Sequence, residues 1–123
     1  MYYHILVKHF HNKKESTSFL CDLSFERVEE LAKVYISEQD FLVNGYIVNK
    51  SCIDRFKICE TKDTIENEIS GIRQRFYSAG IAALGISEDT VINGRGNSKD
   101  VTEEFIKKAL NEKNTLVSKN VVN

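Results

Sequence analysis

The segment INGRGNSKDVTEEF, residues 92–105, combines residue types that could hold a phosphate. Two glycines let the backbone approach a ligand, two cations supply positive charge, and an asparagine and a serine can donate hydrogen bonds. The free N–H groups of the helix predicted to follow would also attract an anion. The residues concerned are Gly94, Arg95, Gly96, Asn97, Ser98 and Lys99, with Asn93 just before them and Thr102 just after.

This loop allows two interpretations. It matches neither of the nucleotide-binding fingerprints GxGxxG and GxxxxGK[ST]. Asp100 is placed to cap the next helix, and its carboxylate can satisfy the same N–H groups that would attract an anion. The segment is therefore either part of an anion site completed from elsewhere in the fold, or a mobile connection between a strand and a helix.

Arg27 is a second candidate because it falls in the first turn of a predicted helix capped by Ser24. The helix dipole disfavours a cation at this end, and local rules are broken more often at functional sites. A phosphate beside the helix start would explain the arginine. The structural alternative is an ion pair with Glu30, three residues further along the same helix.

The third candidate is IRQRFYSAG, residues 72–80. Arg73 and Arg75 lie near a helix C-terminus, where the dipole favours cations without any function being needed. Phe76 continues an apolar stripe and is predicted to be core. Tyr77 falls off that stripe and could offer a flat face on which a nucleotide base stacks.

Metal binding and catalysis have little support in the sequence. His9 and His11 share one face of a predicted strand while His4 lies on the other, and nothing nearby completes a set of four metal ligands. The three cysteines match neither a disulfide framework nor a CxxC motif, so reduced and mostly buried thiols are predicted. We see no nucleophile, base and orienting group arranged for catalysis. We therefore expect no metal, no cofactor and no enzymatic activity.

Length and charge limit the class of protein. A chain of 123 residues with 41% hydrophobic residues can bury one core, which predicts a single domain. The 17 Lys and Arg residues against 18 Asp and Glu residues give a formal net charge of −1, so no global field would hold a nucleic-acid polymer, although one basic face could be hidden in the average. No segment is long and apolar enough for a membrane span, and the start lacks a signal peptide, so a cytoplasmic protein is expected.

Periodicity predicts an α+β fold with a small curved antiparallel sheet and about three helices. The expected elements are a hairpin over 2–10 and 17–23, a helix after Ser24, two or three strands in 41–60 with a tight turn at Asn44–Gly45, a helix over 65–77, a short strand around 90–93, and a helix from Asp100. Residues 114–123 are expected to form a flexible tail of the single domain 1–123.

Two stretches of this chain, FLVNGYIVNKSCIDRFKICET and KDVTEEFIKKAL, resemble the first-described Thoeris anti-defence proteins of phages. The similarity covers nearly the whole chain. It implies a sponge that binds a cyclic ADP-ribose isomer, such as glyco-cyclic ADP-ribose, made by immune enzymes with Toll/interleukin-1-receptor-like domains. The ligand is held without cleavage, in pockets between subunits of a dimer or larger homo-oligomer in the host bacterial cytoplasm.

The ligand-binding residues that the resemblance and the motifs together suggest are Arg27, Arg73, Arg75, Phe76, Tyr77, Asn93, Arg95, Asn97, Asp100 and Thr102. Two other functions stay open. One is a bacterial regulatory or interaction module that contacts protein or RNA, and the other is a small cyclic-nucleotide hydrolase.

Overall fold

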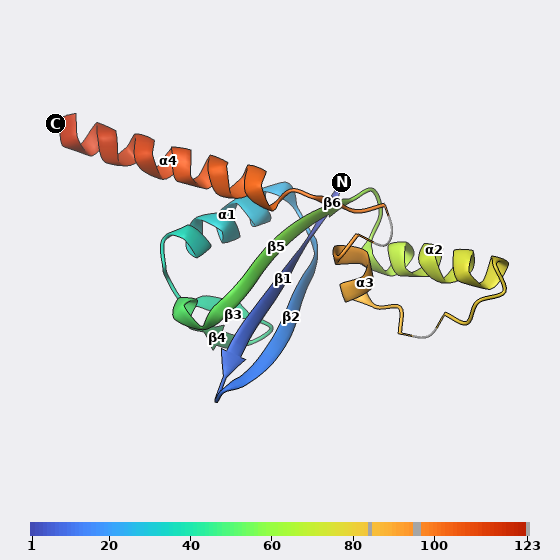
Figure 1. Ribbon diagram of the computed structural model, residues 1–123. Helices are drawn as coiled ribbons and strands as arrows, with labels where there is room; N and C mark the ends of the chain where they lie inside the picture. Colours follow the sequence, from blue (N-terminus) through green and yellow to red (C-terminus); the bar gives the residue numbers. More distant parts are fainter. Residues whose placement is uncertain (84, 95–96, 123) are drawn as a thin grey trace.

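The computed structural model describes residues 1–83, 85–94 and 97–122, and it shows an α+β domain (Figure 1). The predicted hairpin, the antiparallel sheet and the helices after Ser24 and Thr64 are confirmed. The elements in chain order are β1 (Tyr2–His11), β2 (Lys14–Leu23), α1 (Phe25–Ile36), β3 (Phe41–Val43), β4 (Tyr46–Val48), a 3-10 turn (Lys50–Cys52), β5 (Ile53–Thr61), α2 (Ile65–Ser78), α3 (Glu88–Ile92), β6 (Lys99–Asp100) and α4 (Thr102–Val122).

The main sheet has the strand order β2-β1-β5-β6, and every neighbouring pair is antiparallel. The first strand of the chain is therefore a central strand, with β2 on one side and β5 on the other. Strands β3 and β4 form a separate hairpin. The tight turn predicted at Asn44–Gly45 is present, with positive φ at Asn44 (48°) and Gly45 (89°), the pattern of a type I′ turn.

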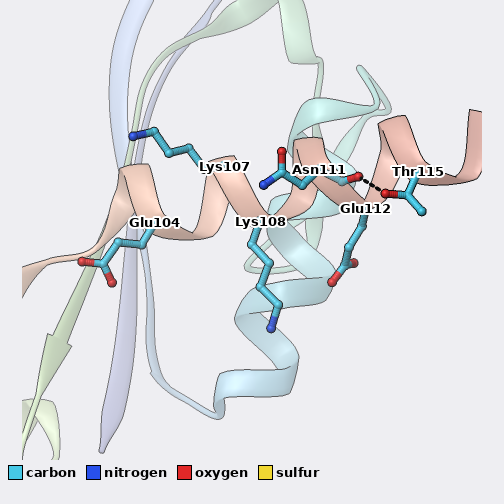
Figure 2. Close-up of a pocket in the computed structure, with 6 residues that line it drawn as sticks. All are labelled: Glu104, Lys107, Lys108, Asn111, Glu112 and Thr115. Carbon is cyan, nitrogen blue, oxygen red and sulfur yellow. Dashed lines mark hydrogen bonds between the residues drawn. The ribbon is translucent and has the colours of Figure 1, made fainter. Parts of the chain in front are cut away.

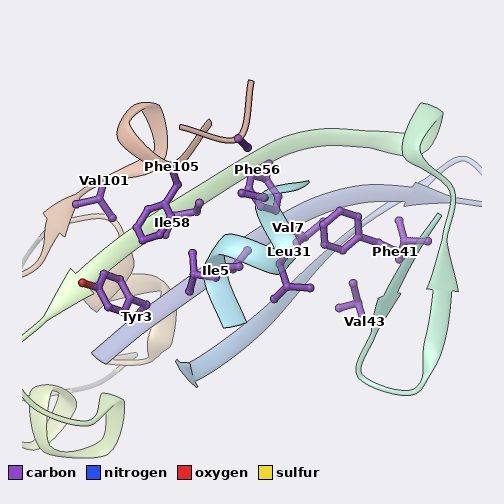
Figure 3. Close-up of a cluster of buried hydrophobic side chains, with 14 residues drawn as sticks. Tyr3, Ile5, Val7, Leu31, Phe41, Val43, Phe56, Ile58, Val101 and Phe105 are labelled. Atoms are coloured by element: carbon purple, nitrogen blue, oxygen red, sulfur yellow. The ribbon is translucent and has the colours of Figure 1, made fainter. Parts of the chain in front are cut away.

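Side chains of β1 alternate between the two faces of this sheet. Tyr3, Ile5 and Val7 point to what we call the core face, which is covered by α1, the β3–β4 hairpin and the start of α4 (Figure 3). His4 and Leu6 point to the opposite side, which we call the second face, and α3 and the start of α2 lie against it. Ile5, Leu6 and Val7 have no exposed surface, so both sides of this strand are buried there.

The core face forms the larger hydrophobic cluster. Helix α1 contributes Val28, Leu31 and Ala32 from one stripe, and α4 contributes Phe105 and Ala109. The two helices are also joined by ion pairs, Lys33 to Glu112 at 2.8 Å and Lys108 to Glu29 at 2.6 Å. Further along, α4 leaves the body of the domain, and its C-terminal end lies far from the sheet (Figure 1).

The predicted strand around residues 90–93 is wrong, because Glu88–Ile92 form α3. The Ser87 backbone N–H donates to Thr90 Oγ1 at 3.2 Å, which fixes the first turn. Val91 and Ile92 are both buried because this helix lies between α2 and the sheet, and two successive buried β-branched residues look like a strand. The backbone of residues 114–122, which we expected in a tail, continues α4.

None of the described helices is long and apolar enough to cross a membrane.

The start of α4 is joined to β5 through Thr102. The Ile58 N–H donates to Thr102 Oγ1 at 2.8 Å, and the Val101 N–H donates to the Ile58 carbonyl at 3.0 Å. The Thr102 hydroxyl lies 2.7 Å from Asp100 Oδ1, to which it donates. One hydroxyl therefore satisfies a buried backbone donor and orients the carboxylate at the helix start.

His4 forms the centre of a buried polar chain on the second face. The Asp22 N–H donates to His4 Nδ1 at 3.0 Å, so the ring proton is on Nε2 and is donated to Thr61 Oγ1 at 2.7 Å. The Thr61 hydroxyl donates to the Asp63 carbonyl at 2.7 Å, and Asp22 Oδ1 accepts the Ile65 N–H at the start of α2 at 2.8 Å. Burial lowers the pKa of His4, and the Asp22 carboxylate only partly opposes this effect.

Replacing Thr102 with Val should lower the free energy of unfolding by about 1–3 kcal/mol, because the Ile58 N–H is left without an acceptor. Chemical denaturation monitored by circular dichroism measures this change. Thr115→Val is the matched control, since Thr115 is exposed on α4 and donates only to a carbonyl of its own helix. Equal losses in both variants would contradict the role given to Thr102.

The neutral His4 should make stability depend on pH. Its pKa is below the unfolded value of about 6.5, so the unfolded chain takes up the proton first as the pH falls. The contribution of His4 is thus complete above about pH 6.5 and is lost below it. Denaturation curves should show that acidification reduces the stability of His4→Gln less than that of the wild type or of His11→Gln, which alters an exposed histidine. An unchanged pH dependence in His4→Gln would contradict this account.

Candidate functional site

Arg27 lies on the exposed side of α1 and makes the ion pair that the structural alternative predicted. Its Nη1 donates to Glu30 Oε2 at 2.9 Å, and both side chains are more than half exposed. The Arg27 N–H also donates to Ser24 Oγ at 3.2 Å, which confirms the Ser24 cap. No ligand is needed to explain an arginine in this first turn.

The four candidates at the end of α2 are close together and differ in burial. Phe76 packs against the cluster formed by Ile72, Ile86 and their neighbours, as predicted. Tyr77 is 64% exposed, also as predicted for a residue off the apolar stripe. Arg73 Nη2 donates to the Ile86 carbonyl at 3.3 Å, and Arg75 is exposed. This end of α2 thus offers the exposed Tyr77 ring, with Arg73 one turn before it and Arg75 on a different side of the helix.

The loop after α3 is described only in part. Asn93 Nδ2 donates to Asp89 Oδ1 at 2.8 Å and to the Asp89 carbonyl at 3.0 Å, so its amide is engaged at the end of α3. Ser98 Oγ donates to the Val91 carbonyl at 2.6 Å, and Asn97 is exposed. The candidate Arg95 lies outside the described residues.

Asp100 and Thr102 are brought together at the start of α4. Asp100 Oδ1 accepts the Thr102 N–H at 3.0 Å and the Thr102 hydroxyl at 2.7 Å. Desolvation acts to raise the pKa of the Asp100 carboxyl, but these hydrogen bonds and the nearby Lys57 and Arg55 charges outweigh it and lower that pKa. The carboxylate therefore occupies donors that an anionic ligand would otherwise use.

A single copy of the chain does not gather the described candidates into one pocket. Arg27 lies on α1, over the core face, whereas Arg73, Arg75 and Tyr77 lie at the far end of α2, beyond the second face (Figure 1). The sheet separates these two groups. A site with residues from both groups requires a second copy of the chain.

The structure adds a group of cations that we did not single out from the sequence. Lys8 of β1 lies directly opposite Arg55 of β5, and Lys57 lies opposite Leu6, all on the second face. We call Lys8, Arg55 and Lys57 the basic surface. The sequence signal is the alternation in RFKI, where Phe56 and Ile58 point to the core face and the two cations point away.

The basic surface has few neutralising partners. Lys8 Nζ lies 3.8 Å from Glu15 Oε1, which is a long ion pair. Arg55 and Lys57 have no carboxylate within ion-pair distance in the described part of the chain, and Asp100, the nearby anion, is engaged with α4. Like charges opposite each other on a sheet are destabilising, so this arrangement costs stability unless an anion binds.

A hollow of about 760 Å³ lies along α4 (Figure 2). The described side chains that line it all come from this one helix: Glu104, Lys107, Lys108, Asn111, Glu112 and Thr115. Lys107 pairs with Glu103, Lys108 with Glu29, and Glu112 with Lys33. Because its charges are already paired, this hollow favours neither an anion nor a cation.

Catalytic and metal chemistry gain no support from the described residues. They contain no cluster of three or more His, Cys, Asp or Glu side chains that could hold a metal ion. Burial raises the pKa of both Cys21 and Cys59 to about 12, so these thiols are not nucleophilic thiolates at neutral pH.

No family model matches the chain, and comparisons with curated proteins and with solved structures found no significant match. The resemblance to Thoeris anti-defence proteins therefore stays a prediction.

The neighbouring rings Phe76 and Tyr77 should respond differently to truncation. Phe76→Ala removes a half-buried ring from the α2–α3 cluster and should cost about 2 kcal/mol of unfolding free energy. Tyr77→Ala should change it by less than about 0.5 kcal/mol because that ring is mostly exposed. Thermal or chemical denaturation of the two variants checks this difference. A loss at Tyr77 as large as that at Phe76 would show that the tyrosine packs in the fold.

Proposed function

We propose that the protein is a non-catalytic binding protein that sequesters a phosphate-bearing nucleotide signal. The resemblance to Thoeris anti-defence proteins suggests that the signal is a cyclic ADP-ribose isomer, such as glyco-cyclic ADP-ribose. In this proposal the protein acts in the bacterial cytoplasm and blocks host defence by lowering the free concentration of the signal.

The observation that carries this proposal is the pair Arg55 and Lys57 on β5, adjacent on one face and without an ion-pair partner in the described part of the chain. Their charges reach the Asp100 carboxylate, but that group is hydrogen-bonded to Thr102, so a pyrophosphate would supply the direct anionic contact that this pair lacks. Charge-assisted hydrogen bonds from a guanidinium and an ammonium to phosphate oxygens are among the stronger polar contacts. Sequestration needs such contacts and no chemical step.

The end of α2 supplies the second part of the proposed ligand contact. The exposed Tyr77 ring is a stacking surface for adenine, and Arg73 lies one helical turn before it. In one copy of the chain the hydrogen bonds of Asp100 and Asn93 are already used within the fold. We therefore propose a homo-oligomer in which the α2 end of one copy completes the site of another, and light scattering on the purified protein tests this assembly.

Incubation with glyco-cyclic ADP-ribose should deplete the free ligand, and heating should then release it intact. A ligand at about 100 times its Kd should stabilise the protein by about 2.7 kcal/mol, which a melting curve detects. Lys57→Ala and Arg55→Ala should each weaken binding roughly tenfold or more, through the loss of a charge-assisted contact.

Lys107→Ala is the matched control, because it removes an exposed lysine that pairs with Glu103 on α4. A new product after heating would show an enzyme, and the absence of depletion would reject the sponge. Equal binding by Lys57→Ala, Arg55→Ala and the wild type would place the ligand elsewhere.

A further inference from the structure

The second face of the sheet is covered at only one end. Ile92 of α3 packs on Leu6 and Cys59, and α2 begins beside Asp22. Towards the β1–β2 turn, the side chains on this face are exposed or half-buried, and in Figure 1 neither α2 nor α3 lies beside that end of the strands. A stretch of three neighbouring strands is thus open on one side.

Cations dominate this open end. Lys8, Arg55 and Lys57 form the basic surface, and Lys13 and Lys14 lie at the β1–β2 turn. Three carboxylates lie near them. Glu15 pairs with Lys8 at 3.8 Å, Asp54 is at the irregularity between β1 and β5, and Asp100 is close to Lys57 and Arg55 but is hydrogen-bonded to Thr102. Counting the turn lysines, of which Lys14 pairs with His11 and points to the other face, five cations lie beside three carboxylates, a local excess of positive charge in a chain whose net charge is −1.

Aromatic side chains lie among these cations. Phe10 alternates with Lys8 along β1, so it points to the same second face, and it is 44% exposed. Phe19 lies opposite Leu6 on β2, packs against it and is half-buried. Thr17, opposite Lys8, is exposed and adds a hydroxyl between the two rings.

We propose that this open end of the second face binds single-stranded nucleic acid, with Lys8, Arg55 and Lys57 on phosphates and Phe10 stacked on a base. A basic strand surface that carries flat rings has the two features that hold a single strand without sequence preference. In a duplex the bases are already stacked on each other, so the Phe10 ring would have no free base face to stack on. This binding is a further activity, and it shares only Arg55 and Lys57 with the proposed nucleotide site.

An oligothymidylate of about 16 nucleotides with a fluorescent label is the probe, and anisotropy at low salt is the measurement. The logarithm of the binding constant should fall with the logarithm of salt concentration, with a slope of about −2 for three neutralised phosphates. Lys8→Ala should reduce that slope by about 0.7, while Lys107→Ala should leave it unchanged. An oligouridylate arm tests RNA and a duplex of the same length tests double-stranded DNA.

Phe10→Ala should weaken binding of the single strand roughly tenfold. Phe10→Leu keeps apolar area and loses the flat ring, so it should weaken binding as well. Phe25→Ala is the matched control, because that ring is 40% exposed but lies beside α4 and Phe105 on the core side. Circular dichroism confirms that each variant is folded under the binding conditions.

Several outcomes would overturn this proposal. They are the absence of binding by either single strand, equal or tighter binding of the duplex, and affinity that is unaffected by Phe10→Ala and Phe10→Leu. A polyglutamate peptide that binds as well as the oligonucleotide would show a general polyanion surface instead. The Phe10→Ala variant should still deplete glyco-cyclic ADP-ribose. A variant that loses oligonucleotide binding but keeps this depletion separates the two activities and leaves the sponge proposal intact.

Discussion

The burial of β1 on both faces is the constraint on which the other elements depend. This strand pairs with β2 on one side and β5 on the other, and Ile5, Leu6 and Val7 have no exposed surface. One face of the strand supports the cluster with α1 and α4, and the other supports His4, Leu6 and α3. A register slip by one residue would exchange these two sets of side chains, so the pairing is strongly specified.

The two faces of the sheet are covered unequally because α3, which packs on the second face, is short, and the 14-residue α2 meets that face only at its start. Helix α3 has five residues and spans about 7.5 Å, whereas the ten residues of β1 extend over about 33 Å. The core face receives two longer helices and a hairpin, so its apolar residues are enclosed. The second face keeps an open end, and there the chain places cations opposite each other at a cost in stability.

Local patterns predicted the elements whose signals are local. The Ser24 cap, the apolar stripe that Phe76 continues and the Asn44–Gly45 turn each depend on residues a few positions apart. Helix α3 was missed because its apolar residues follow no helical period. Val91 and Ile92 are apolar because the short helix is buried between α2 and the sheet. Strand β6 pairs with β5 across about forty residues, and no local pattern indicates such a partner.

The candidate site was predicted less well for the same reason. Tyr77 and Phe76 could be separated by helical spacing alone, and their exposure agrees with it. The convergence of Arg27 with the α2 end is absent in one chain, because α1 and α2 lie on opposite sides of the sheet. The sequence shows that Arg55 and Lys57 alternate with apolar residues, but their position beside Lys8 depends on the β1–β5 register.

The central place of the first strand also governs synthesis. The β1–β2 hairpin leaves the ribosome long before β5, so Ile5 is made well before Ile58, the residue it pairs with. Helix α4, which completes the core face, is made later still. Until then the nascent hairpin displays apolar side chains on both sides, and such surfaces attract chaperones and neighbouring chains. Pairing between such distant segments also slows folding. In a nascent chain stalled before residue 53, β1 would be paired with β2 but would still lack β5, its second partner.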